Sequence, residues 1–290
     1  MQLGIVTPVV TLLPRAHARW EADAGIEEIC RVAIEAERLG YDHLTCSEHI
    51  AVPKDKAKLR GATYWDPLST FGYIAGVTHK IRLATFVLVL GYHHPLEIVK
   101  RYGTLDALSG GRVVLGVGVG SLEEEFALLD APFTDRGARA DDALRALRAS
   151  WGQTQPEYHG EFFDYSDFVV APIAPRTDVA IWIGGQSTRS LNRALAFGDA
   201  WAPFGLSPSE VRALLDSARL TAAWENRPQP IEIFLQPVPP LDPIGDPAAT
   251  TQQLEEWITA GATGLTLRFV HRSIDHYCEQ LAALSALIPA

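Results

Sequence analysis

The neighbouring residues Glu48 and His49 are the candidates for acid–base chemistry, since they close the strand-like stretch HLTCSEH at 43–49. An imidazole exchanges a proton near neutral pH, and an adjacent carboxylate can bias its charge. Neighbouring residues of a strand point to opposite faces. We therefore expect one of the two to face a ligand and the other to brace a neighbouring element. A hydrogen-bonded structural histidine is the alternative.

Glycine alternates with valine in the stretch VLGVGVG, which puts Gly116, Gly118 and Gly120 at every second position. This spacing differs from the dinucleotide fingerprint G-x-G-x-x-G, and no Gly-Lys-Ser/Thr follows it as a phosphate loop requires. The remaining interpretation is a strand with its glycines on one face. Glycine in a strand often marks a close approach to the backbone, so we expect a flat ligand to lean on Gly118 and Gly120.

The stretch IWIGGQSTRS offers backbone groups for binding. Gly184 and Gly185 lead through Gln186 and Ser187 into a predicted helix, whose first turn has unpaired N–H groups and the positive end of the helix dipole. An anionic phosphate is the natural ligand of such a turn. The alternative is an ordinary helix cap made by the Ser187 hydroxyl.

Four basic residues gather in the segment after residue 50: Lys54, Lys56, Lys58 and Arg60. This segment is either a solvated loop or a basic rim that attracts a long polyanionic ligand. No metal site is expected, because the adjacent residues His93 and His94 lack the i, i+4 spacing of a helical zinc site.

Eight strand-like runs, each eventually followed by an amphipathic helix, carry these candidates. The strands are predicted at 3–10, 43–49, 81–90, 112–120, 179–185, 199–205, 231–238 and 264–269. The helices are predicted at 26–40, 66–77, 96–108, 136–151, 188–197, 208–224, 247–259 and 274–287. Several strands are too uniformly apolar to have a wet face, which is typical of parallel strands covered on both sides. The pattern predicts one α/β domain over residues 1–290, a (β/α)8 TIM barrel, with an open doubly wound sheet as the alternative.

Active sites of such barrels lie at the C-terminal ends of the strands, so we expect the candidate residues around one mouth. The irregular segment 152–177, rich in proline and aromatic residues, is predicted to be an insertion within the barrel. Its aromatic side chains form either a lid or packing: Tyr158, Phe162, Phe163 and Tyr165.

Composition narrows the class of protein. The net charge of −10 argues against nucleic acid as a partner, and no apolar run approaches the roughly 20 residues needed to cross a bilayer. Three scattered cysteines predict no disulfide framework, and the N-terminus shows no signal-peptide pattern. We therefore expect a cytoplasmic protein with no membrane or nucleic-acid partner.

The sequence resembles the bacterial luciferase-like superfamily of flavin and deazaflavin oxidoreductases over nearly its whole length. The most specific block is LDALSGGRVVLGVGVGSLEEEFALLDAPFTDRGARADDALRALRASW. The stretches CSEHI, RLATFVLVLGYHHP and IWIGGQSTRSLNRALAFGDAW match further blocks in the family's order. The resemblance depends on the agreement of several blocks in the same order, since no single block is specific enough.

The resemblance implies a barrel that is usually dimeric, with a tricyclic cofactor ring in its mouth. The positions that match ring contacts of the family are His49, Thr85, Phe86, Val87, Leu88, Gly118, Gly120 and Ser121. Gly184, Gly185 and Ser187 match the family's phosphate-binding turn. Members that use coenzyme F420 have a non-proline cis peptide on the third strand, and Thr85-Phe86 occupies the matching place.

The resemblance favours an F420-dependent oxidoreductase that moves a hydride between C5 of the deazaflavin and a small organic substrate, with His49 handling the proton. The basic segment would suit the polyglutamate tail of F420. The alternatives are an FMN-dependent monooxygenase that uses reduced flavin and O2, and a non-catalytic flavin-binding protein. Two departures bear on the cofactor: Glu48 replaces an aspartate common in the family, and Phe204 replaces a phosphate-binding threonine of some deazaflavin enzymes. A homodimer is expected.

Overall fold

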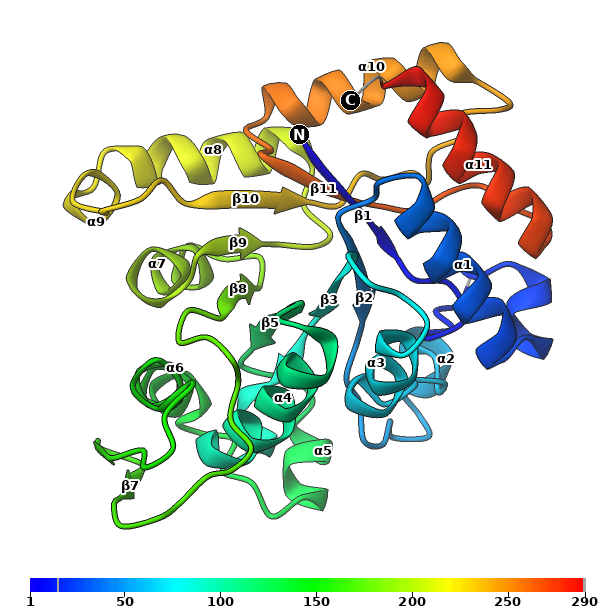
Figure 1. Ribbon diagram of the computed structural model, residues 1–290. Coiled ribbons are helices and arrows are strands. Elements are labelled where there is room, and N and C mark those ends of the chain that lie inside the picture. The colour runs from blue at the N-terminus through cyan, green and yellow to red at the C-terminus, as the bar shows by residue number, and fades with distance from the viewer. Residues whose placement is uncertain (15, 289–290) are drawn as a thin grey trace.

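Parallel strands closed into a ring form the centre of the computed structural model, which describes residues 1–14 and 16–288 (Figure 1). Within these residues the ring has eight positions, each taken by a strand that we call a stave. The staves are β1 (Gln2–Val6), β2 (His43–Cys46), β3 (Arg82–Thr85), β5 (Val113–Gly118), β8 (Ala180–Gly184), β9 (Ala200–Ala202), β10 (Glu232–Leu235) and β11 (Gly264–Leu267). Each stave pairs in parallel with the next, β1 pairs with β11, and β3 pairs with β5. The predicted (β/α)8 barrel is therefore confirmed over the open sheet.

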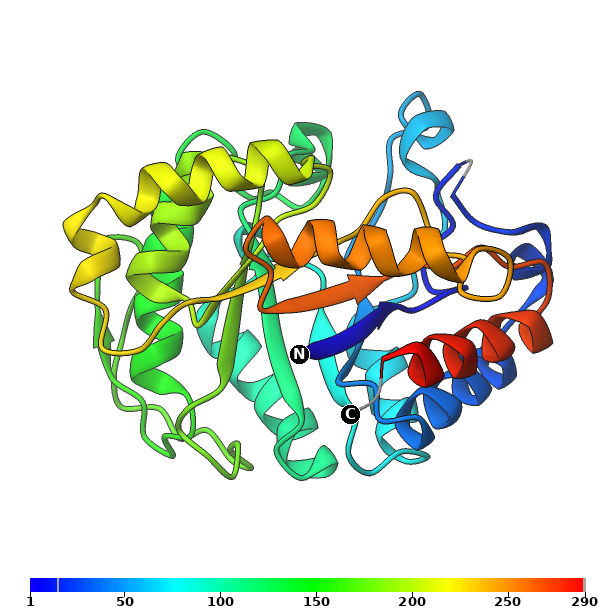
Figure 2. The same ribbon diagram turned by 90° about the horizontal axis from the view of Figure 1, so that it is seen from above.

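Helices lie outside the strands, as Figure 2 shows. They are α1 (Ile26–Arg38), α3 (Pro67–Ala75), α4 (Pro95–Ser109), α6 (Arg136–Ser150), α7 (Thr188–Phe197), α8 (Pro208–Arg219), α10 (Pro247–Thr259) and α11 (Ile274–Leu287), with short helical turns α2 (Ala57–Arg60), α5 (Glu123–Leu128), α9 (Ala222–Glu225), η1 (Arg19–Asp23) and η2 (Leu90–Tyr92). Local chemistry sets their ends: the Asp66 side chain accepts from the Ser69 amide at 2.8 Å, and Pro67 opens α3. None of the helices in the described residues has both the length and the apolar character needed to cross a bilayer.

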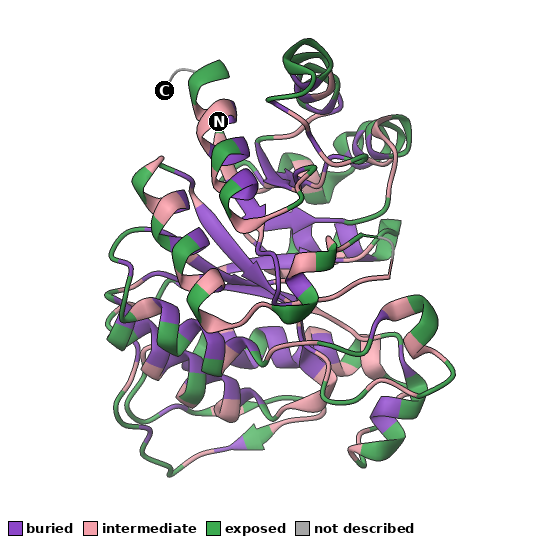
Figure 3. Cartoon of the chain, turned by 90° about the vertical axis from the view of Figure 1, so that its right-hand side faces the viewer, coloured by how far each residue is buried: buried purple, intermediate pink, exposed green. Residues whose placement is uncertain are grey.

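Two layers of buried side chains hold the barrel together, and Figure 3 shows the buried strands at its centre. One layer fills the space between strands and helices. The other fills the lumen, where Trp182 stacks on Phe234 with ring centroids 3.9 Å apart. His43 lies against both rings, and its ring nitrogens contact Asp42 and Thr266 at 2.8 Å each. This packed layer blocks the lumen, so a ligand can enter only above it.

The third stave is broken, although the sequence predicted one continuous strand at 81–90. After β3, the backbone turns inward at Phe86 and Val87 and resumes pairing with β5 as β4 (Leu88–Val89). The cis peptide lies between Phe86 and Val87, one bond later than the predicted Thr85-Phe86 position. The parallel pairing of β3 with β2 extends as far as this bond. Thr85 still pairs with Cys46, and the Phe86 amide still donates to the Cys46 carbonyl at 2.8 Å, so the chain leaves the strand only after Phe86.

The insertion at 152–177 is a hairpin of β6 (Tyr158–His159) and β7 (Asp164–Tyr165) against α6. Its polar groups converge on the buried carboxylate of Asp142, which accepts from the Tyr158 hydroxyl at 2.5 Å and from the Phe162 and Phe163 amides. Tyr165 bonds Ser150 on the same helix. The aromatic residues of the insertion therefore pack against α6, and none of them lines the cavity at the C-terminal ends of the staves.

A Gly4→Ala variant is expected to lose about 1–3 kcal/mol of stability, because the added Cβ would lie 2.2 Å from the His43 ring in the packed lumen. The matched control is Gly72→Ala on an exposed face of α3, where a Cβ meets nothing within 4 Å. That control is expected to gain up to about 1 kcal/mol from helix propensity. Urea unfolding of both variants measures the two effects, and equal stabilities would contradict the tightly packed lumen.

Candidate functional site

A cavity of about 450 Å³ opens where the staves end at their C-terminal side. Every stave or the loop after it contributes a lining residue. They run from Val6 at the end of β1 through His49, Val87, Gly118, Gly184, Phe204 and Gln236 to Arg268 after β11. This is the end of the barrel at which the candidate residues were expected. The volume lies in the range of small-molecule sites.

The ring order divides the cavity into two facing walls. In a ring of eight staves, β5 lies across from β11, and β8 lies across from β1. One wall therefore comes from the β4–β5–β8 side, with Val87, Gly118 and Gly184, and is apolar. The opposite wall comes from the β10–β11–β1 side and contains Gln236 and Arg268. His49, after β2, lies between the two walls along the ring.

Gly118, Gly120 and Gly184 line the cavity as expected, but the protein itself uses the space left by their missing side chains. A Cβ on Gly118 or on Gly184 would lie 2.7 Å from a methyl group of Val87. A Cβ on Gly120, whose φ is +77°, would meet Val89 and Phe126. The inward turn of the third stave brings the Val87 side chain between Gly118 and Gly184. A flat ligand against these glycines, as the sequence predicts, would therefore also meet Val87.

His49 faces the cavity and is held from behind by a buried carboxylate. Its Nδ1 lies 2.7 Å from Oε2 of Glu125 on α5, and the Tyr92 hydroxyl donates to the same oxygen at 2.7 Å. The other oxygen of Glu125 accepts from the amides of Ile50 and Ala51 at 2.6 and 3.0 Å. Burial raises the pKa of the Glu125 carboxyl, but these hydrogen bonds outweigh it and hold the pKa below its usual value. An ionised Glu125 fixes the His49 ring with its proton on Nδ1.

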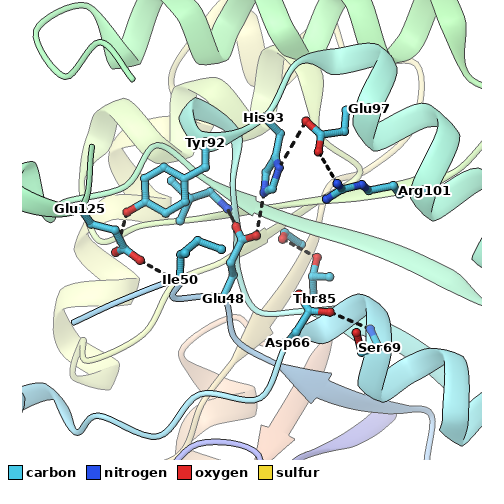
Figure 4. A network of polar contacts seen from close by, with 12 residues as sticks. Glu48, Ile50, Asp66, Ser69, Thr85, Tyr92, His93, Glu97, Arg101 and Glu125 are labelled. Carbon is cyan, nitrogen blue, oxygen red and sulfur yellow. Dashed lines mark hydrogen bonds and ion pairs between the residues drawn. The ribbon is translucent and has the colours of Figure 1, made fainter. Parts of the chain in front are cut away.

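Glu48 acts as the brace that the alternation of the strand predicted. Its carboxylate accepts from the Val89 amide at 2.7 Å, which fastens β4, and contacts His93 Nε2 at 2.7 Å (Figure 4). Figure 4 follows the network outward, from His93 to Glu97 at 3.8 Å and on to Arg101 at 2.8 Å. Burial lowers the pKa of His93, but the carboxylates of Glu48 and Glu97 together outweigh burial, so that its net pKa lies above its usual value. One edge of Glu48 also reaches the cavity.

Of the other residues predicted to contact the cofactor, some line the cavity and others lie behind its wall. Phe86, Val87, Ser121 and Gly185 line the cavity. Four residues predicted to bind the cofactor do not: Thr85, Leu88, Gln186 and Ser187. Thr85 and Leu88 are fully buried, and the Thr85 hydroxyl donates to the Gly116 carbonyl at 2.7 Å. Gln186 donates to the Phe204 carbonyl, and the Ser187 hydroxyl caps α7, which was the alternative for that turn.

The basic segment reaches the cavity through one of its four members. Arg60 lines the cavity and lies 3.4 Å from the Ser121 hydroxyl, while Lys56 pairs with Glu124 at 2.9 Å. These two contacts bind the segment to the loop and helix after β5, so it forms one side of the mouth. In the part of the chain that the structure describes, no group of three or more His, Cys, Asp or Glu side chains is placed to hold a metal ion.

Glu125, Tyr92, Gln236 and Arg268 are site residues that the sequence did not reveal. Glu125 stands in a run of three glutamates whose local pattern does not distinguish its members. Only the start of α5, which turns Glu125 inward and leaves Glu124 half-exposed, separates them. Arg268 is one charged residue at the end of an apolar run, a position that a solvated loop residue also takes.

Comparison with known proteins identifies relatives of this barrel. The family model described as luciferase-like monooxygenase matches residues 1–275. An uncharacterised protein of Mycobacterium tuberculosis (strain ATCC 25618 / H37Rv) is 30% identical over 280 residues, which cover 90% of this chain and 95% of that protein. An FMNH2-dependent dimethylsulfone monooxygenase of Pseudomonas putida is 27% identical and an F420-dependent glucose-6-phosphate dehydrogenase of Intrasporangium calvum 26% identical. Each matches 52% of this chain, and the matches cover 42% and 47% of those proteins.

Solved structures agree on the fold. A monooxygenase from Streptomyces bottropensis superposes with a TM-score of 0.78 at 19% identity, over 99% of this chain and 98% of that one. An F420-dependent secondary alcohol dehydrogenase in complex with an F420-acetone adduct gives a TM-score of 0.75 at 16% identity, over 98% of both chains. At these identities the likeness shows the barrel alone.

A Glu125→Gln variant is expected to lose about 1–3 kcal/mol at pH 7, because an amide cannot accept both backbone N–H groups, His49 and Tyr92 at once. The pKa of Glu125 is lowered by folding, so its contribution is complete above the ordinary value near 4.5 and is lost as the pH falls through the folded-state value. Denaturant unfolding at pH 7 and pH 4 is therefore expected to show the difference from wild type shrinking with acid.

The control for this experiment is Glu124→Gln, one residue earlier, whose carboxylate is half-exposed and pairs with Lys56 at the surface. It is expected to leave stability nearly unchanged at both pH values. Equal effects of the two substitutions would show that Glu125 is not the buried support of His49.

Proposed function

The chain belongs to the luciferase-like monooxygenase family, and we propose that within this family of oxidoreductases and monooxygenases it is an F420-dependent oxidoreductase acting on a small organic substrate. The observation that carries the proposal is a cavity with an apolar wall on one side and a single oriented histidine beside it. The family includes both F420-dependent and flavin-dependent members, so the choice of cofactor is a proposal.

The cavity fits a planar ring system. Its apolar wall is formed by Val87, Val89 and the glycines of β5 and β8. Its volume of about 450 Å³ lies in the range of sites that bind drug-sized ligands. We assign the ring to this wall, where it would lie against the Val87 side chain and the neighbouring backbone of Phe86 and Gly118. Gly184 and Gly185, which line the cavity just before α7, would hold the anionic part that continues from the ring.

Bound F420 supplies a centre at C5 that accepts or donates a hydride. Removing a hydride from a carbon that bears a hydroxyl also releases the hydroxyl proton, and the reverse reaction needs one delivered. His49 is the group that takes or gives this proton at Nε2, since Nδ1 is engaged by Glu125 and the structure gives Nε2 no hydrogen-bond partner among the described residues. Glu125 stabilises the imidazolium that forms, and Glu48 keeps β4 in place.

The basic segment favours F420 over FMN. Arg60 lines the cavity, and Lys54 and Lys58 belong to the same segment, so a polyglutamate tail that left the cavity on this side would meet positive charge. FMN ends in a single phosphate and gives this segment no role.

We also retain from the sequence the expectation of a homodimer.

The second candidate is an FMN-dependent monooxygenase, which Glu48 and Phe204 favour because both depart from the deazaflavin pattern. Reduced flavin would supply two electrons, one atom of O2 would enter the substrate and the other would leave as water. The third candidate is a non-catalytic flavin-binding protein. The orientation of His49 by Glu125 disfavours it, because simple binding does not require an oriented histidine.

Titration of the purified protein with F420, followed by its fluorescence, and with FMN and reduced FMN, followed by absorbance, tests the proposal. F420 is expected to bind at least about tenfold tighter than FMN, a difference of about 1.4 kcal/mol. Tight binding of FMN without binding of F420 would overturn the cofactor choice. Oxygen uptake with reduced FMN would support the monooxygenase.

A His49→Gln variant tests the role of the histidine, with the exposed His79→Gln as control. Turnover of F420 with a panel of alcohols and carbonyl compounds is expected to fall about 10²- to 10⁴-fold for His49→Gln. Affinity for F420 should change little in either variant. Loss of F420 binding in His49→Gln, with no turnover in the wild type, would favour the binding protein.

A further inference from the structure

The wall opposite the apolar one carries a cation without a partner. Arg268 follows β11, and two residues earlier Thr266 bonds His43 inside the lumen. Side chains alternate along a strand, so Arg268 points to the same inner side, one layer above the packed lumen. It lines the main cavity and also a smaller one of about 20 Å³ beside it.

Several arginines elsewhere in the barrel are paired with carboxylates, whereas Arg268 is not. Arg82 pairs with Asp42, Arg148 with Asp199 at 2.7 Å, and Arg176 with Asp106 at 3.1 Å. Among residues 1–14 and 16–288, the Arg268 guanidinium has no salt bridge and no hydrogen bond. Burial lowers its pKa, with the carboxylate of Glu21 opposing that effect from a distance.

Glu21 does not serve as the missing partner, because its carboxylate forms no salt bridge with Arg268 and is engaged by other groups. It accepts from the amides of Val9 and Ala18 at 2.8 and 2.6 Å and lies 3.5 Å from Nε2 of His271. A half-buried guanidinium with no anion beside it is unfavourable unless a ligand supplies one.

Two further polar groups without partners lie on the same wall. Thr11 lines both of the cavities that Arg268 lines, and its hydroxyl oxygen is buried with no hydrogen-bond partner in the described residues. Gln236, after the neighbouring stave β10, lines the main cavity, and its side chain likewise has no partner among those residues. Donors that the fold leaves unsatisfied in one place are best explained by an acceptor that is bound there.

We propose that Arg268, Thr11 and Gln236 form a carboxylate-binding subsite, so that the substrate is a small organic acid. This deepens the proposed function and depends on it for the reaction at the other end of the substrate. A guanidinium offers two parallel N–H groups that match the planar carboxylate, while the hydroxyl and the amide supply further donors.

The position of the subsite fits a substrate held between the two walls. β11 lies across the ring from β5, so a carboxylate on Arg268 directs the rest of the substrate toward the apolar wall. Val6, Val10 and Leu13 line the cavity on the same side as Arg268 and suit a short hydrocarbon chain. The substrate class is therefore an acid with an apolar body and a reactive carbon at a distance from the carboxylate.

Calorimetric titration of the purified protein without added cofactor tests the subsite, with hexanoate as probe and hexanamide as its uncharged counterpart. Wild type is expected to bind hexanoate at least about tenfold tighter than hexanamide. Arg268→Gln should abolish this preference and Arg268→Lys should keep part of it. Arg272→Gln, an exposed arginine of the same loop that lines neither cavity, should leave it unchanged.

Three results would overturn the proposal. The first is equal binding of hexanoate and hexanamide by wild type, or an unchanged preference in Arg268→Gln. The second is tight binding of hexyl phosphate with rejection of hexanoate, which would make the subsite one for phosphate. The third is a loss of F420 or FMN affinity in Arg268→Gln as large as the loss for hexanoate, because Arg268 would then hold the acidic tail of the cofactor.

Two measurements keep these outcomes interpretable. Thr11→Val and Gln236→Leu are each expected to weaken hexanoate several-fold while hexanamide changes less, and they replace Arg268→Gln if circular dichroism shows that variant unfolded. Failure of both F420 and FMN to bind wild type would overturn the proposed function, whereas the comparison of hexanoate with hexanamide would still decide the subsite.

Discussion

The contact of Val87 with Gly118 and Gly184 is the constraint on which the mouth of this barrel depends. A Cβ at either glycine would lie 2.7 Å from a Val87 methyl group, closer than van der Waals contact permits. The two glycines therefore let the third stave turn inward and put an apolar side chain at the centre of one wall. Two adjacent staves, β5 and β8, lack side chains there so that a third can supply one.

Buried carboxylates hold the inward turn and the histidine in register with each other. Glu48 fastens the Val89 amide beyond the turn, and Glu125 fixes both His49 and the two amides that follow it. Each carboxylate is surrounded by donors, which is the condition under which a buried charge is tolerated. Both buried carboxylates at the apolar wall are thus satisfied within the protein.

The opposite wall has the contrary property, since Arg268, Thr11 and Gln236 have no partners among the described residues. The two walls face each other because β11 stands across the ring from β5. One wall suits a flat apolar ligand and the other an anionic group, so a substrate bound between them would have a defined orientation.

The sequence by itself determined the barrel, because uniformly apolar strands alternating with amphipathic helices bury both faces of a parallel sheet in few ways. It also put His49, Gly118 and Gly184 at the mouth, since strand ends follow from the same alternation. The tertiary structure alone decided what fills the space beside the glycines, which of three consecutive glutamates supports His49, and that Arg268 stays unpaired. These are contacts between staves and loops distant in the chain, and local pattern carries no information about which side chains meet there.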